Sequence, residues 1–277
     1  MKQKDNIDIR GFACVVLPEL NYDAQLIAIR HLLKFHEDVH NNLDNEINEL
    51  EKSVKTSQGI ICELFEFERE EKLEFSVYQS AAHSMSAVGM LAPLMESIFF
   101  QAFYGIRKNI FDRKLLANNH ARWKHAENEK WDCHFVWGKS GRKEDLVRGI
   151  IQLSEATGLS PYLPSDIEIV MKVLFSYRNK MFHRGFEWPL EERLHFWSRI
   201  KKENWPSTYL EAATINGQPW VVYLSKEFIW HCIEIIEKVI VSLGNFVFEI
   251  SGLAQQNTTA DPVNVGGVTG KSCGRVR

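Results

Sequence analysis

The sequence predicts a mainly α-helical protein: a helical bundle with an N-terminal helical extension and one small β-hairpin insertion. Apolar residues recur at three- and four-residue spacing over most of the chain, which is the period of an amphipathic helix. Only the stretch 208–224 has the pattern of paired strands. Hydrophobic residues make up 45% and charged residues 25% of the 277 residues, so the chain can bury a core.

The N-terminal part, residues 1–75, is expected to be an acidic helical region. Residues 21–56 and 60–72 have apolar residues at helical spacing. Between Glu37 and Glu74 there are twelve acidic and four basic residues. Such a region suits an assembly surface or a regulator, and the sequence does not decide between them.

The segment 76–110 is expected to form the central buried helix. Its stretch 84–106 is almost uncharged and long enough to span a bilayer. Glu96, however, would lie near the middle of a span, where an acidic side chain is costly. We therefore expect a core helix and no membrane partner.

The rest of the domain, up to residue 250, is expected to be helical apart from two places. Residues 115–141 read as irregular structure, and Asn216-Gly217 predicts a hairpin at about 208–224. The residues from 251 to 277 are small and polar, which predicts a disordered tail. Helices are expected at 143–157, ending at Gly158, and at 166–183, 190–203 and 225–250.

Charge and cysteine usage narrow the class of protein. A net charge of −3 argues against non-specific coating of nucleic acid, which needs a dominant basic surface. A local basic strip that includes Arg107 and Lys108 could still contact phosphates, although a solvated helix face explains it equally well. The cysteines are scattered singly and no apolar leader follows Met1, so we expect a cytoplasmic protein.

Two motifs suggest other chemistry but lack its context. His36-Glu37-Asp38-Val39-His40 matches the H-E-x-x-H zinc-hydrolase pattern, yet Asp38 is charged and no third histidine follows at motif spacing. The stretch 265–272 resembles a phosphate-binding loop but lacks its first glycine and a following helix. We expect no cofactor and no metal, and keep the zinc hydrolase as the weaker alternative.

The segment 177–189 is the most informative for function. Arg178 is followed by Asn179 and, four residues later, by His183, after an apolar helix and just before Gly185. An Arg followed by four to six residues and then a His also occurs from Arg30 to His36 and from Arg113 to His120. The context, and not the spacing, therefore distinguishes the pair Arg178 and His183.

This context resembles the R-N-x-x-x-H motif of the HEPN (higher eukaryotes and prokaryotes nucleotide-binding) class of ribonucleases. The resemblance covers about residues 80–250 and implies a HEPN-like helical domain over 76–250. It also implies a metal-independent endoribonuclease that works as a homodimer with facing motifs, in a bacterial toxin or antiviral defence role, with RNA and a regulatory or antitoxin protein as partners. A non-catalytic HEPN-like module that binds RNA, a nucleotide or a protein is the alternative.

The chemistry of these residue types fits RNA cleavage by the 2′-hydroxyl. Histidine can move protons near neutral pH, and arginine offers a fixed fork of donors to a phosphate. Asn179 is expected to orient His183 or a phosphate oxygen, because residues four apart share a helix face. A lone acid in an apolar helix should be paired or functional. The resemblance implies that an acidic residue on an earlier helix approaches the motif, so Glu96 is a further candidate for the catalytic group, with Arg178 or a different residue as its partner. Lys180, Arg184, Arg107 and Lys108 are the predicted RNA-binding residues.

Overall fold

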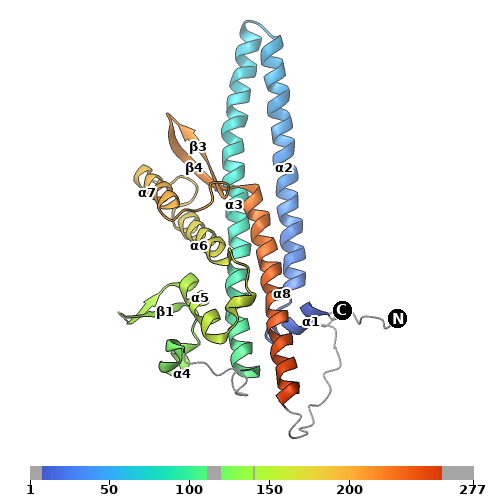
Figure 1. The fold of residues 1–277 in the computed structure, drawn as a ribbon. Helices are drawn as coiled ribbons and strands as arrows, with labels where there is room; N and C mark the ends of the chain where they lie inside the picture. The colour runs from blue at the N-terminus through green and yellow to red at the C-terminus, as the bar shows by residue number, and fades with distance from the viewer. Residues whose placement is uncertain (1–7, 111–119, 140, 258–277) are drawn as a thin grey trace, which may run out of the picture. The chain divides into compact units, whose positions relative to one another are not determined.

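The protein is mainly helical and has two small antiparallel hairpins (Figure 1), which confirms the predicted fold class at its coarse level. The computed structural model describes residues 8–110, 120–139 and 141–257. The chain divides into two compact units, each built from separated segments. The first unit comprises the described residues within 8–22, 94–172 and 234–257; the second comprises residues 23–93 and 173–233.

A long antiparallel helix pair dominates the second unit. It consists of α2 (Tyr22–Thr56) and the part of α3 (Ile60–Asn109) up to Pro93, which are joined by a short turn that includes Gly59 and run side by side (Figure 1). Along α2, the buried apolar residues Leu26, Ile29 and Leu33 recur every three or four residues, which is the pattern of an amphipathic helix. An ion pair links the two helices, with 2.7 Å between Lys72 Nζ on α3 and Glu46 Oε2 on α2.

The remainder of the second unit contains the predicted hairpin. Its elements are the end of α6 (Ile167–Arg184), α7 (Leu190–Lys202), β3 (Leu210–Ile215), β4 (Gln218–Leu224) and the start of α8 (Lys226–Asn257). Asn216 and Gly217 turn the chain with φ of 53° and 75°, which glycine and asparagine tolerate best. The Tyr177 hydroxyl donates to the Val222 carbonyl at 2.9 Å, which ties α6 to β4 inside the core.

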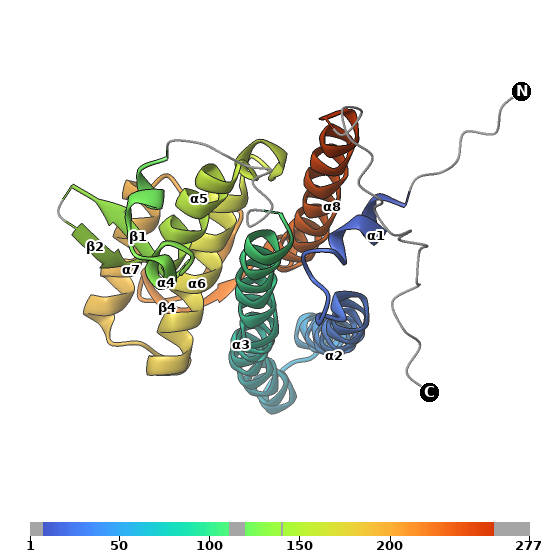
Figure 2. The ribbon, with the colours of Figure 1, turned by 90° about the horizontal axis from the view of Figure 1, so that it is seen from below.

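The first unit is built around α5 (Leu146–Thr157), whose caps agree with the sequence. Asp145 accepts a hydrogen bond from the Arg148 amide at its start, and Gly158 ends it in the left-handed conformation, as predicted. The chain before α5 forms η2 (Ala121–Lys124), α4 (Glu127–Lys130), β1 (Phe135–Gly138) and β2 (Gly141–Glu144). Of these elements, β1 and η2 contact α5, and β2 pairs with β1 (Figure 2). Helix α1 (Ile9–Ala13) and the turn η3 (Ser160–Tyr162) complete the described elements.

Three expectations need correction. A second hairpin, β1–β2, occupies part of the predicted irregular region 115–141, so the expectation of a single hairpin was wrong. Helix α3 is one element where two runs were expected, because its Glu-rich stretch consists of good helix formers. Residues 251–257 continue α8 and are not part of a disordered tail, while 258–277 lie outside the described residues.

Helix α3 contains the stretch that required a membrane check. Within the described chain it is the one helix whose length and hydropathy would allow it to cross a bilayer, and 56% of the relevant window is buried inside the protein. Leu91, Met95, Ile98 and Phe99 are among its fully buried side chains. This burial agrees with the expectation of a core helix.

Candidate functional site

The predicted catalytic motif lies on the last turns of α6, on the side away from its buried face. Val173, Leu174 and Tyr177 are fully buried, whereas Asn179 and His183 are exposed and Arg178 is half-buried. The helix ends at Arg184, one residue after His183. The amphipathic pattern of α6 therefore presents the three motif residues to solvent, where a large substrate can reach them.

Asn179 holds the Arg178 side chain in a defined orientation. The Arg178 Nε and Nη2 atoms both donate to Asn179 Oδ1, at 3.2 and 3.1 Å. The guanidinium carbon of Arg178 lies 5.2 Å from the ring centre of Phe175, so a cation–π contact also holds the side chain. Asn179 was expected to orient His183 or a phosphate oxygen, but within the described chain its amide oxygen contacts Arg178 and makes no hydrogen bond to His183.

The basic residues beside the motif share one carboxylate. Lys180 and Arg184 both form ion pairs with Glu192 of α7, at 2.8 and 2.9 Å. The hydrogen bond from Lys180 lowers the pKa of Glu192, with a further contribution from Arg184. Glu192 therefore neutralises part of the charge that was predicted to bind RNA.

Glu96 is part of a charged cluster in the first unit. Its Oε1 atom lies 3.2 Å from His134 Nε2, and His134 Nδ1 lies 2.8 Å from Asp132 Oδ1. Burial lowers the pKa of His134, but the hydrogen bonds to Asp132 and Glu96 outweigh burial and raise it above its usual value. Because Arg178 belongs to the other unit, the pairing of Glu96 with Arg178 stays a prediction.

Sequence reasoning missed His134 as a residue of interest. Asp132 and His134 are two residues apart, and Glu96 is 38 residues earlier, a spacing that no motif describes. Cys133, between Asp132 and His134, is buried, and burial raises the pKa of its thiol to about 12, so it stays protonated at neutral pH.

The remaining predicted RNA-binding residues lie in the first unit at the end of α3. Arg107 forms an ion pair of 3.4 Å with Glu127, and the Lys108 ammonium lies 5.9 Å from the ring centre of Tyr104. Neither contact removes these side chains from solvent. Their role in binding RNA stays a prediction.

The H-E-x-x-H motif on α2 is engaged in other contacts. Glu37 forms ion pairs with Lys226 and Lys34, and the hydrogen bond from Lys226 lowers its pKa. His40 lies 3.7 Å from Asp44. Among the described residues, no three His, Cys, Asp or Glu side chains are grouped so that they could hold a metal ion. The zinc alternative therefore lacks a third ligand in the part of the chain that is described.

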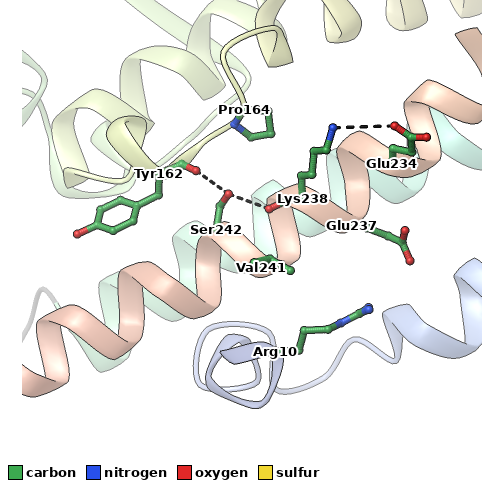
Figure 3. A pocket seen from close by; sticks show the side chains of 8 residues that line it. All are labelled: Arg10, Tyr162, Pro164, Glu234, Glu237, Lys238, Val241 and Ser242. Carbon is green, nitrogen blue, oxygen red and sulfur yellow. Dashed lines mark hydrogen bonds and ion pairs between the residues drawn. The ribbon is translucent and has the colours of Figure 1, made fainter. Parts of the chain in front are cut away.

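The first unit has a shallow groove of about 570 Å³ (Figure 3). Its charged lining residues Glu234 and Lys238 face each other at 3.9 Å, and Ser242 donates to the Tyr162 carbonyl at 2.6 Å. The lining consists of Arg10, Tyr162, Pro164, Glu234, Glu237, Lys238, Val241 and Ser242. It contains no histidine or cysteine, and we assign it no chemistry.

No protein-family model, curated protein or solved structure matches this chain. Its function is therefore inferred from the residues and their geometry.

Proposed function

We propose that the protein is a metal-independent endoribonuclease of the HEPN type, with Arg178 and His183 at the reacting phosphate. The observation that carries the proposal is the presentation of these side chains at the exposed end of α6, with the Arg178 fork held by Asn179. A guanidinium fixed in this way loses little rotamer entropy when it binds a phosphate oxygen.

The proposed reaction breaks the P–O5′ bond and forms a P–O2′ bond. A neutral imidazole removes the proton of the 2′-hydroxyl, whose oxygen attacks phosphorus. Arg178 stabilises the charge that develops on the phosphorane oxygens. The leaving 5′-oxygen takes a proton from a second acid, so the products carry a 2′,3′-cyclic phosphate and a 5′-hydroxyl.

One motif supplies one imidazole for these two proton transfers. A homodimer with facing motifs would supply a second, and we include it in the proposal for that reason. The catalytic contribution of Glu96 and the RNA contacts of Lys180, Arg184, Arg107 and Lys108 belong to the same proposal. The role as a toxin or antiviral effector, with a regulatory partner in the cytoplasm, follows from the resemblance alone.

The test is cleavage of defined RNA oligonucleotides by purified protein in excess EDTA. His183→Ala and Arg178→Ala should each lower the rate by about 10²-fold or more, because general acid–base help and charge stabilisation contribute on that scale. His195→Ala, which removes an exposed histidine of α7 outside the motif, is the matched control and should cleave normally. Wild-type cleavage that disappears with the chelator would contradict the mechanism.

One observation favours a binding module as the second candidate. The Arg178 guanidinium is already bonded to Asn179, and Glu192 pairs with both Lys180 and Arg184, so these cations have partners within the chain. A protein that binds RNA or a nucleotide without cutting it would show saturable binding that Arg178→Ala removes. Such a binding protein would release no fragment with a 2′,3′-cyclic phosphate from any RNA tested.

A further inference from the structure

The first turns of α3 carry an exposed apolar stripe, which we define as Ile60, Leu64, Phe67 and Phe75. These side chains are 76%, 62%, 68% and 51% exposed. At 3.6 residues per turn all four lie within about 80° of the helix circumference. Ile60, Leu64 and Phe67 follow one another on successive turns, and Phe75 returns to the same face after the exposed Glu71. Isolated exposed apolar residues are ordinary, but several large ones on one helix face indicate a binding surface.

Further along α3, the same helix face contacts other elements of the same unit at Tyr78. Tyr78 lies one turn after Phe75, and its ring lies 5.4 Å from that of Trp220. The Tyr78 hydroxyl donates to Glu187 Oε1 at 2.6 Å. The stripe therefore ends where Tyr78, on the same face, contacts β4 and the segment after α6.

The partner helix α2 does not cover the stripe. It contacts α3 through other positions, where Lys72 pairs with Glu46 and Cys62 donates to the Val54 carbonyl at 3.5 Å. Lys72 and Cys62 lie about 100° and about 180° around the helix from the centre of the stripe. The stripe therefore faces solvent while the side of α3 that faces α2 is occupied.

The charge around the stripe selects the kind of partner. Within the described chain, none of the glutamates of this stretch forms an ion pair; they are Glu63, Glu66, Glu68, Glu70, Glu71 and Glu74. Two copies of the stripe would bring like charges together, and an anionic lipid surface would be repelled. A positively charged partner would instead be attracted to the rim while its apolar side chains cover the stripe.

We propose that the α3 stripe is the docking site for a basic amphipathic helical segment of another protein. Such a segment places apolar side chains at i, i+3, i+4 and i+7 against Leu64 and Phe67, in the helix-in-groove manner. Its Lys and Arg residues pair with the flanking glutamates. The site is independent of the nuclease proposal, because none of its residues belongs to the Arg178–His183 motif.

The experiment uses the full chain and two synthetic helical peptides with the same leucine pattern, one with lysine and one with glutamate at the remaining positions. Fluorescence anisotropy should show saturable binding of the lysine peptide and none of the glutamate peptide. Leu64→Ser with Phe67→Ser should weaken binding at least tenfold, and Glu71→Gln with Glu74→Gln several-fold. Ile215→Ser, an exposed apolar residue at the tip of the β3–β4 hairpin, should leave binding unchanged.

Several outcomes would overturn the proposal. If both peptides bound equally well, the charge of the partner would not matter. If the Leu64→Ser/Phe67→Ser variant (the stripe variant) bound the lysine peptide as tightly as the wild type does, the stripe would not be the site. Sedimentation that shows a dimer abolished by the stripe variant would assign the stripe to a second copy of the chain. Flotation with phosphatidylcholine vesicles that the same variant abolishes would assign it to a membrane surface. Because all substituted side chains are exposed, circular dichroism should confirm that every variant is folded.

Discussion

Replacing Arg122 by methionine should destabilise the first unit locally and leave the second unit unaffected. The Arg122 side chain is fully buried, and burial lowers its pKa to about 10, which leaves it charged at neutral pH. Its guanidinium donates to the carbonyls of Lys130, Asp132 and Phe135, and to the Gln152 side chain. These bonds connect the chain before β1 to α5.

The size of the effect follows from the groups that lose their donor. Each hydrogen bond from a charged donor is worth about 1.5–3 kcal/mol, but such values do not add, and methionine restores some apolar burial. Each buried acceptor left without a donor costs about 1–3 kcal/mol. We therefore expect a loss of about 3 kcal/mol, which at 1.4 kcal/mol per tenfold change is roughly a 10²-fold change in a local opening equilibrium.

Hydrogen exchange measured by mass spectrometry tests this expectation. Protection of amides in 121–137 should fall by about 10²-fold in Arg122→Met, because exchange from this segment reports its local opening. Amides in 210–224, which belong to the second unit, serve as the internal reference. Arg122→Lys keeps the charge but has fewer donors and should be intermediate. If protection in 121–137 changed by less than about threefold, the buried guanidinium would not stabilise this segment.

Two further predictions concern the second unit. Asn179→Ala should lower the rate of RNA cleavage about 10–10²-fold without unfolding, because Arg178 loses its orienting acceptor, whereas Asn179→Asp keeps that contact. Equal rates for Asn179→Ala and the wild type would show that this contact has no role. Burial, with the neighbouring His36 and His40, lowers the pKa of His83 to about 4, so the folded state binds fewer protons than the unfolded state below about pH 6.5. Stability should therefore fall as the pH drops from about 6.5 toward 4, and with allowance for partial exposure the loss at pH 5 should be about 1 kcal/mol. The free energy of unfolding of the wild type and of His83→Gln, measured by urea titration at about pH 6.5 and at pH 5, checks this. An equal pH dependence of the two proteins would contradict it.

The elements with strong local signals could be predicted from the sequence. Asn216-Gly217 predicted the β3–β4 hairpin, and Gly158 predicted the end of α5, because each position needs a backbone conformation that few residues tolerate. The β1–β2 hairpin was missed. Its first strand is only four residues long, its second strand, Gly141–Glu144, has no apolar residue, and no alternation of apolar and polar residues marks it.

The candidate site could be predicted only in part. The exposure of Asn179 and His183 follows from the helical period, so it was available from the sequence. The contacts of the charged side chains were not, because they depend on which elements come together in space. Glu192 meets Lys180 across α6 and α7, and His134 meets Glu96 although the two residues are 38 positions apart.

The charge distribution limits how the proposed nuclease can select RNA. Binding to a phosphate backbone gains strength from counterion release, in proportion to the number of free cations that contact it. Lys180 and Arg184 already share Glu192, and the net charge of the whole chain is −3, so this non-specific contribution should be small. An enzyme built in this way would recognise a particular RNA shape or exposed bases, and it would cut bulk RNA slowly. If cleavage instead weakened steeply with salt on every RNA tested, a basic surface larger than the four predicted RNA-binding residues would have to contact the substrate.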